Sequence, residues 1–354
     1  MRRGTAHLHT ARSSTALTRN FRVLNTLLRT FADHARPTPF TIGLYVNARD
    51  ELHLREWVAH HLALGFTHIT IFDHASIVPI DRTISHAKVT VIRIEDGAIP
   101  AGGLKMTFMD RAIALARDGG MDWIMYLDAD EYLVIPSIQS SSCTSPVAAM
   151  LNNALLLSPA CNQFTFNWLL FGSAYKDVDD LASTTIAQYT RSDAHFNPLV
   201  KCLARVCAIS GPTSNPHFFT MRDHVPFNVT HSERHAGATF EDVHVFQPKH
   251  LPHTCALPRA STEGCDKTQF CLKAPAYIAH YSVQAYDVYL ARKVRLPRDD
   301  TGAYRPECTP DDLHAQSNAI LNDAVEKQYG EIVKRGIVYL AAHNATSTSS
   351  THAP

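Results

Sequence analysis

The feature that most constrains the fold is an alternation of short apolar runs with helical patterns over residues 40–127. The apolar runs are residues 40–46, 67–72, 88–94 and 123–127. The helical patterns are residues 51–64 and 104–117, and a glycine follows closely after each. Short runs rich in β-branched residues indicate strands, and strands that alternate with helices indicate parallel βαβ units. We therefore expect an α/β protein with a Rossmann-like, mostly parallel central sheet and helices on both faces.

The pattern is less regular after residue 136. We expect helices at residues 146–157, 285–294 and 311–338, and strands at residues 162–171, 200–209 and 243–247. Residues 1–37 are rich in arginine, serine, threonine and histidine, and we expect a basic tail that is flexible or forms an accessory helix. Residues 38–338 are expected to form the folded domain. Residues 339–354, rich in serine, threonine and alanine, are expected to form a disordered tail.

The charge balance and the hydropathy argue against several classes of protein. Lysine and arginine together number 33, as do aspartate and glutamate, so the chain lacks the overall positive charge typical of nucleic-acid-binding proteins. We expect no nucleic-acid partner. No uninterrupted apolar run reaches the ~18 residues of a transmembrane helix, and none has the form of a secretory signal. We therefore expect a cytoplasmic protein without a transmembrane segment.

The strand expected at residues 123–127 runs directly into three carboxylates, Asp128, Asp130 and Glu131. Asp128 and Asp130 fall on the same side of an extended chain, where their charges repel unless a cation or hydrogen-bond donors lie between them. Carboxylate oxygens are the ligands that Mg²⁺ and Mn²⁺ prefer. Because α/β sheets bind ligands beyond the carboxyl ends of their strands, the cluster predicts a metal site there. The alternatives are a solvated turn and a magnesium-dependent phosphoesterase.

Further segments occur in a fixed order around this cluster. They are residues 50–65, 72–76, 123–133, 166–173 and 201–217, and His280-Tyr281 followed by Lys293. In this order they resemble the motifs NE…LxEWxxYHxxLG, YDNxS, WxxxxDxDEF, WxxFGxS, KxIxRP…H and HYxxKSxxxFxxK. These motifs are those of the family 92 glycosyltransferases and their bacterial and viral relatives, within the family-2-like GT-A group. The chain departs from them at Asp50, His74 and Gln284-Ala285.

The resemblance implies a GT-A fold over residues 38–338 and a metal-dependent hexosyltransferase. Such an enzyme moves a hexose, with galactose as one candidate, from a UDP-sugar to a hydroxyl group of a glycan or glycoconjugate. The members of family 92 resemble glycosyltransferases that act with inversion, so inversion is expected here. The implied cofactor is Mn²⁺ or Mg²⁺, which neutralises the departing diphosphate. Because the chain lacks a membrane anchor, a cytosolic, virus-encoded or prokaryotic enzyme fits it best.

The resemblance also implies roles for individual residues. The implied nucleotide-sugar ligands are Val46, Glu51, Asp73, Asp128, Lys201 and Lys293. The implied metal ligands are Asp130 and Asp128, completed by a late histidine, for which the candidates are His280 and His217. Glu131 is expected to orient a partner or the acceptor. Trp168, Phe171 and Tyr175 are candidates for a platform under sugar rings.

An inverting transfer needs a general base that deprotonates the acceptor hydroxyl, and a carboxylate is expected in this role. The candidates are Asp193, Glu241 and Asp242, which lie where such folds build the acceptor site. We favour Asp242, because the Glu241-Asp242 pair is similar to a pair found in family-2 enzymes.

Plainer roles are open for the same residues. Asp73 can instead be a helix N-cap, and a histidine can be a satisfied core residue. The departures at His74 and Gln284 favour a second hypothesis, a catalytically silent GT-A fold that binds a glycan or nucleotide. The intact set of Asp128, Asp130 and Glu131 favours an active enzyme.

Overall fold

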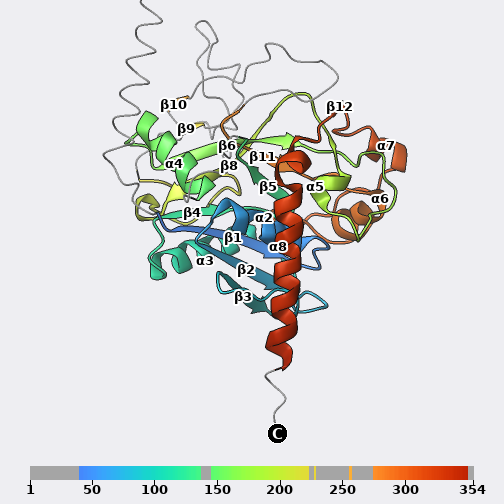
Figure 1. Cartoon of the computed structure of the whole chain (residues 1–354), viewed down its shortest axis with the longest axis horizontal. Helices are drawn as coiled ribbons and strands as arrows, with labels where there is room; N and C mark the ends of the chain where they lie inside the picture. Colours follow the sequence, from blue (N-terminus) through green and yellow to red (C-terminus); the bar gives the residue numbers. More distant parts are fainter. Residues whose placement is uncertain (1–39, 137–144, 223–226, 229–254, 257–273, 350–354) are drawn as a thin grey trace, which may run out of the picture. The chain divides into compact units, whose positions relative to one another are not determined.

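The computed structural model describes residues 40–136, 145–222, 227–228, 255–256 and 274–349 (Figure 1). The expected basic tail at residues 1–37 and the expected strand at residues 243–247 lie outside the described residues.

Four parallel strands form one half of the central sheet. They are β1 (Ile42–Ala48), β2 (His68–His74), β3 (Val89–Ile94) and β4 (Trp123–Tyr126). Their order is β4-β1-β2-β3, and every pairing among them is parallel. The four expected strands of residues 40–127 are therefore confirmed, as is the mostly parallel pairing of this half.

The other half of the sheet is mixed. It contains β5 (Glu131–Val134), β6 (Gln163–Leu170), β8 (Asn197–Arg205), β9 (Phe227–Asn228), β10 (Cys255–Ala256) and β11 (Tyr277–His280). β8 lies between β4 and β6 and is antiparallel to both. β11 is parallel to β6 and antiparallel to β5. A separate pair joins β7 (Arg191–Ser192) to β12 (Ile320–Leu321).

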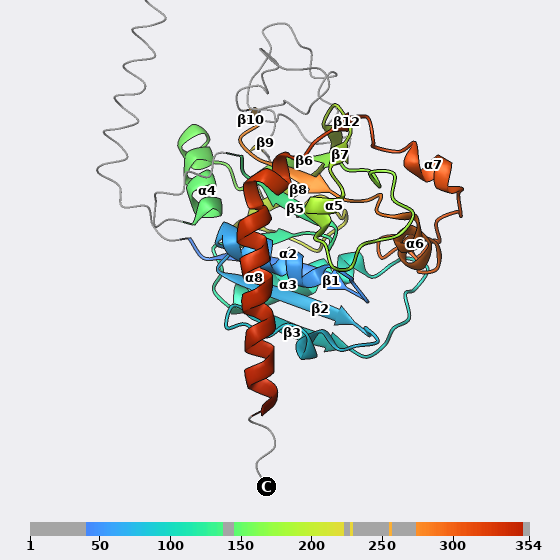
Figure 2. The same ribbon diagram turned by 45° about the vertical axis from the view of Figure 1, so that its right-hand side comes forward.

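Helices cover both faces of the sheet, as expected (Figure 2). The side chains of β4 alternate between the faces, because successive residues of a strand point to opposite sides. Trp123 and Met125 pack in one core cluster with Trp57 of α2 (Leu54–Leu64). Ile124 and Tyr126 pack in another with α3 (Lys105–Asp118). α8 (Ala324–Ser349) lies over α2 and adds buried side chains to the first cluster.

Gly65 ends α2 in a left-handed conformation, with φ of 84°, which favours glycine. A Cβ atom at this position would lie 2.4 Å from the hydroxyl oxygen of Ser145. That hydroxyl donates to the carbonyl oxygen of Gly65 and accepts from the N–H of Ala148, so it caps α4 (Pro146–Leu157). The glycine therefore allows one helix to end against the start of another.

The shorter helices lie in the loops. They are η1 (Ile80–Arg82), α5 (Thr185–Gln188), η2 (Val206–Ala208), α6 (Tyr286–Val288), η4 (Tyr289–Val294) and α7 (Pro310–His314). The strand expected at residues 200–209 ends at Arg205 and continues as η2. The helix expected at residues 285–294 is present as α6 followed by a π-helix, η4.

The single helix expected at residues 311–338 is wrong, because the chain there forms α7, β12 and α8. Ser317 interrupts the helix with φ of 53°. The side-chain amide of Asn318 donates to the carbonyl oxygens of His314 and Gln316, so it satisfies backbone groups that a helix would use itself. The expected domain end at residue 338 falls inside α8, where Leu340 is buried.

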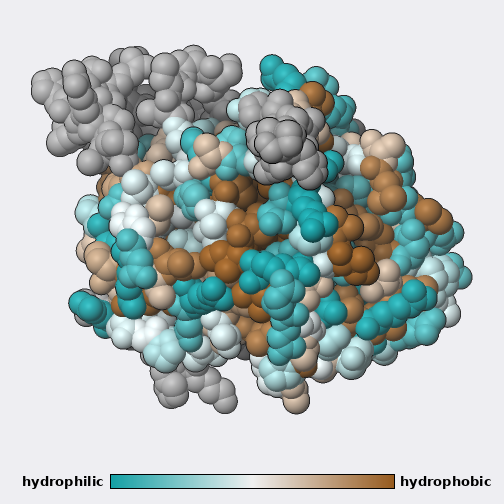
Figure 3. Space-filling view, turned by 90° about the horizontal axis from the view of Figure 1, so that it is seen from below, coloured by the Kyte–Doolittle hydropathy of each residue, from teal (hydrophilic) through white to brown (hydrophobic). Residues whose placement is uncertain are grey.

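The surface carries apolar side chains in several places. Ile77 is 88% exposed and Val338 is 68% exposed. Figure 3 shows apolar patches between polar side chains on the face seen from below. Of the helices that the structure describes, none combines the length and the apolar character needed to cross a membrane.

A buried histidine pair joins α2 to β5. His60 Nε2 donates to the carbonyl oxygen of Leu133 at 2.8 Å, and its ring packs against those of His61 and Tyr329. Burial lowers the pKa of His60 from 6.5 to about 4. Burial, together with His60, lowers the pKa of His61 well below its ordinary value. Both rings are therefore neutral in the folded protein at neutral pH.

We expect the free energy of unfolding to fall as the pH is lowered from 6.5 to about 4. In this window the unfolded chain binds protons at histidines that the folded chain keeps neutral, so protonation favours unfolding. His60→Gln keeps a donor for Leu133 and should remove roughly 2–3 kcal/mol of this loss, measured by urea unfolding at several pH values. The exposed His195→Gln is the control. Equal pH dependence in His60→Gln and wild type would contradict the assignment.

Candidate active site

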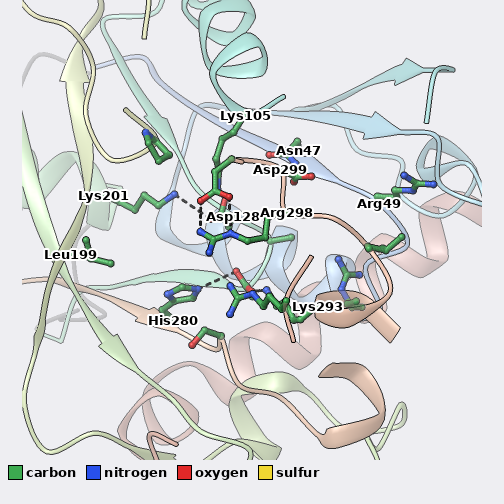
Figure 4. Close-up of a pocket in the computed structure, with 18 of the residues that line it drawn as sticks. Asn47, Arg49, Lys105, Asp128, Leu199, Lys201, His280, Lys293, Arg298 and Asp299 are labelled. Carbon is green, nitrogen blue, oxygen red and sulfur yellow. Dashed lines mark hydrogen bonds and ion pairs between the residues drawn. The ribbon is translucent and has the colours of Figure 1, made fainter. Parts of the chain in front are cut away.

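Two pockets differ in their lining. A groove of about 450 Å³ between α2 and α8 is lined mainly by apolar residues such as Leu62 and Ile332. A second pocket, of about 390 Å³, lies at the carboxyl ends of the strands (Figure 4). Seven arginines or lysines and five aspartates or glutamates line this second pocket. Convergent charge at this edge of an α/β sheet marks the second pocket as the candidate active site.

The acidic cluster lies in a tight turn between β4 and β5. The backbone N–H of Asp128 donates to the Glu131 carboxylate at 2.8 Å, and the N–H of Glu131 donates back to the Asp128 carbonyl oxygen at 3.0 Å. This turn directs Asp128 and Asp130 into the pocket, which both residues line. The cluster therefore reaches the predicted edge of the sheet through a turn and not through an extended chain.

Two buried lysines hold the Asp128 carboxylate. Lys105, the first residue of α3, pairs with Asp128 Oδ1. Lys201, on β8, lies 3.3 Å from Asp128 Oδ2. Burial raises the pKa of Asp128, but the two ammonium groups outweigh burial and hold the pKa well below its ordinary value. Asp128 is therefore an anion whose two oxygens already have cationic partners.

Asp130 has a different pair of partners. Lys293 Nζ lies 2.6 Å from Asp130 Oδ2, and His280 Nε2 lies 3.5 Å from Asp130 Oδ1. Burial raises the pKa of Asp130, but Lys293 and His280 outweigh this effect and lower it well below its usual range. The antiparallel pairing of β11 with β5 brings His280 here, because the N–H of Tyr281 donates to the Asp130 carbonyl oxygen.

Glu131 is buried and does not line the pocket. Its Oε2 lies 3.2 Å from Lys201 Nζ and accepts from the N–H of Asp128. Within the described residues, its Oε1 has no hydrogen-bond partner. Burial raises the pKa of Glu131, while Lys201 opposes the rise. Its contacts are with Lys201 and Asp128, and its role in orienting a partner or the acceptor stays a prediction.

The predicted nucleotide-binding residues divide into two groups. Lys201, Lys293 and Glu51 line the pocket with Asp128. Glu51 pairs with Arg292; burial raises its pKa to about 7, against the lowering effect of Arg292. Val46 instead lies in the apolar core on the α2 side of the sheet. Its neighbour Asn47 points to the pocket edge, because successive strand residues face opposite sides.

Asp73 is buried and is not among the residues that line the pocket. Its carboxylate accepts from the N–H groups of Ser76 and Ile80, each at 3.0 Å, and from Arg93 at 2.8 Å. These contacts tie the turn after β2 to β3. Asp73 therefore caps the turn after β2 and the first N–H group of η1, although the N-cap residue of η1 is Pro79 and not Asp73.

The remaining predicted residues lie in different places. His217 lines the pocket, and its Nδ1 donates to the carbonyl oxygen of Val200 at 2.9 Å. Trp168 lines the pocket with its ring between those of His217 and His280. Phe171 is in the core, and Tyr175 is 60% exposed, so the three aromatic residues do not form one platform. Glu241 and Asp242 lie outside the described residues, and Asp193 does not line the pocket.

Several pocket residues were not predicted from the sequence. They are Asn47, Arg49, Lys105, Arg298, Asp299 and Asp300. Lys105 had a signal, since it begins a helix that follows a strand of the parallel sheet. Asp299 reaches the site through a loop, where its carbonyl oxygen accepts from the N–H groups of Leu104 and Lys105 and its carboxylate accepts from Asn47. No local sequence pattern indicates such a contact.

Protein side chains supply only part of the ligand set that a divalent cation needs in this pocket. The described residues contain no group of three or more histidine, cysteine, aspartate or glutamate side chains arranged for a metal. Asp130 Oδ1 and His280 Nε2, 3.5 Å apart, are two suitable donors in the pocket. Mg²⁺ and Mn²⁺ sites often combine one or two protein ligands with phosphate oxygens and water, so the pair fits a cation that binds with a diphosphate. Among the described residues, His280 Nδ1 has no hydrogen-bond partner.

Removing the buried ammonium group of Lys201 should destabilise the protein. Lys201→Met leaves Glu131 without a cation and Asp128 with only one, and the expected loss is about 3 kcal/mol in urea unfolding. Adding Glu131→Gln to Lys201→Met should restore part of the loss, because a neutral side chain does not need the cation. If the effects of the two substitutions on the free energy of unfolding simply add, the pairing of Lys201 with Glu131 is contradicted.

The substitution Asp73→Ala distinguishes a capping role of Asp73 from a role in nucleotide binding. We expect it to lower the free energy of unfolding by about 1–3 kcal/mol, because two buried N–H groups and Arg93 lose their acceptor. Affinity for UDP, measured by calorimetry on protein shown to be folded, should be unchanged. A large loss of UDP affinity without loss of stability would instead support the nucleotide-binding role.

No protein-family model matches this chain, and no curated protein sequence matches it. Two solved structures of Rv0371c from Mycobacterium tuberculosis H37Rv, one of them in complex with manganese, are similar to part of it. The sequence identities are 15% and 12%, and each match covers 37% of this chain and 66% or 67% of the other. The TM-score is 0.24 in both cases, so function has to be argued from the residues of the pocket.

Proposed function

We propose that this chain is a metal-dependent GT-A glycosyltransferase that moves a hexose from a UDP-sugar to a hydroxyl group of a glycan, with inversion. The observation that carries the proposal is the approach of His280 Nε2 to within 3.5 Å of Asp130 Oδ1 in a cation-rich pocket. These residues come from two motifs of the resemblance that lie far apart in the sequence.

Asp130 and His280 would hold the Mn²⁺ or Mg²⁺ ion, with Asp128 beside it. The ion would supply positive charge to the diphosphate that leaves the sugar. Lys105, Lys201 and Lys293 would add ammonium groups around the same diphosphate. A leaving group that gains negative charge is stabilised most by cations that are already in place, because little reorganisation is then needed.

The part of the pocket lined by the end of β6 and the start of β8 suits a sugar. Trp168, Leu170 and Leu199 give it an apolar surface, and Asn197 adds an amide group. Aromatic and aliphatic side chains with a few polar groups are typical of small-molecule sites. We place the transferred hexose or the acceptor against this wall. The general base of an inverting transfer stays a prediction, with Asp242 as the candidate.

A catalytically silent binding module is the second candidate. One observation favours it: Asp128 and Asp130 are each already paired with lysine. Such pairs keep a carboxylate cluster stable without a ligand, so they are compatible with a site that no longer performs transfer. The chain also carries His74 and Gln284 where the motifs of the resemblance have asparagine and lysine.

UDP binding with and without Mn²⁺ tests the proposal. We expect calorimetry to show Mn²⁺-dependent binding of UDP to the wild type and a loss of at least tenfold in affinity for Asp130→Asn, because the variant lacks an anionic metal ligand. Asp323→Asn is the matched control, since Asp323 pairs with the exposed Lys327 on α8 and does not line the pocket. Release of UDP from UDP-hexoses then separates an active enzyme from the silent module.

Equal UDP affinity in wild type and Asp130→Asn would remove the metal role of Asp130. Absence of UDP binding to the wild type in every condition would favour the silent module with a different ligand.

A further inference from the structure

We propose that Lys293 occupies the place of the divalent cation at Asp130 until a nucleotide diphosphate draws it away, so that cation and nucleotide bind as a unit. The inference rests on the proposed function and concerns the order in which that site fills. It assigns to Lys293 a positioning role in addition to contact with phosphate.

The contact is short and largely buried. Lys293 Nζ lies 2.6 Å from Asp130 Oδ2, and the side chains are 24% and 11% exposed, respectively. His280 lies on the other oxygen of the same carboxylate. Lys293 therefore bonds one oxygen of Asp130 while the second oxygen faces the other proposed metal ligand.

The residue next to Lys293 is anchored by its side chain. Lys293 belongs to the π-helix η4, and the neighbouring Arg292 donates to the carbonyl oxygen of Asp50 at 2.6 Å and pairs with Glu51. π-Helical turns are uncommon and occur often at functional sites. Here the turn brings two consecutive cationic residues into one pocket. Because its neighbour Arg292 is held by these contacts, Lys293 can change partners through rotation of its own side chain.

The charges of the cluster are balanced without a metal. Three carboxylates, of Asp128, Asp130 and Glu131, face three ammonium groups. The ammonium groups belong to Lys105, Lys201 and Lys293. Figure 4 shows Lys201 and Lys293 directed toward this centre from different elements. A divalent ion alone would add two unbalanced positive charges to a buried site, which is strongly unfavourable.

A nucleotide diphosphate changes this balance. The diphosphate of a UDP-sugar carries about two negative charges and that of free UDP about one more, so entry of either with a divalent ion adds no net positive charge. An ammonium group has three donors and no fixed plane, so Lys293 can exchange the Asp130 oxygen for a phosphate oxygen. The exchange frees Asp130 for the cation. Cation and nucleotide should therefore each raise the affinity for the other by the same factor.

Mn²⁺ titration followed by electron paramagnetic resonance of the free ion tests the inference. The full chain is used, as wild type, Lys293→Met and Lys293→Arg, first without UDP and then with saturating UDP. For the wild type we expect weak binding of Mn²⁺ alone and at least tenfold tighter binding with UDP. For Lys293→Met we expect Mn²⁺ alone to bind at least tenfold more tightly than to the wild type, with a smaller effect of UDP.

Two controls make the result specific. Lys293→Arg keeps the positive charge and should bind Mn²⁺ alone as weakly as the wild type. Lys327→Met removes an exposed lysine that pairs with Asp323 on α8, and it should leave all affinities unchanged. Circular dichroism checks that each variant is folded.

Unchanged or weaker binding of Mn²⁺ alone by folded Lys293→Met would overturn the inference. If the wild type still shows UDP-dependent Mn²⁺ binding in that case, the proposed function stands and only the role of Lys293 fails. If the wild type binds neither UDP nor Mn²⁺, the proposed function fails together with the inference.

Discussion

The antiparallel pairing of β5 with β11 is the interaction on which the candidate site depends. It places His280 opposite Glu131 and gives the carbonyl oxygen of Asp130 a donor in Tyr281. β11 also pairs with β6, which carries Trp168, so the same strand joins the acidic turn to the apolar wall of the pocket. Without this strand, Asp130 would have no His280 beside it, and the acidic turn would lose its connection to the apolar wall of the pocket.

Charge compensation is the next constraint. Three carboxylates close together repel one another, and burial increases the cost of each charge. Each of the three lysines comes from a different element: Lys105 begins α3, Lys201 lies on β8 and Lys293 lies on η4. The ion pairs therefore connect the parallel half of the sheet, its mixed half and the C-terminal segment. Stability and ligand binding use the same charges, so each affects the other.

The sequence predicted the parallel half of the sheet well, because each element there has a local periodic signal. It also predicted that Asp128 and Asp130 lie at the edge of the sheet, and the family resemblance offered His280 and His217 as candidates for a histidine near them. It did not predict the face to which a strand residue points. For this reason Val46 was predicted to bind the nucleotide, whereas its neighbour Asn47 lines the pocket. It did not predict the contact of Asp299 with the start of α3, because that contact depends on how a distant loop folds back.

An active transferase and a silent module share all of these ground-state contacts. They differ in what happens when an anion enters the pocket. In a transferase, at least one lysine must be able to leave its carboxylate for the phosphates, so that ion pair cannot be much stronger than the contact that replaces it. Lys201 is almost fully buried between Asp128 and Glu131 and has little freedom to move, whereas Lys293 is 24% exposed and holds one oxygen of Asp130. This asymmetry suits a site in which Lys201 fixes the acidic turn and Lys293 exchanges partners.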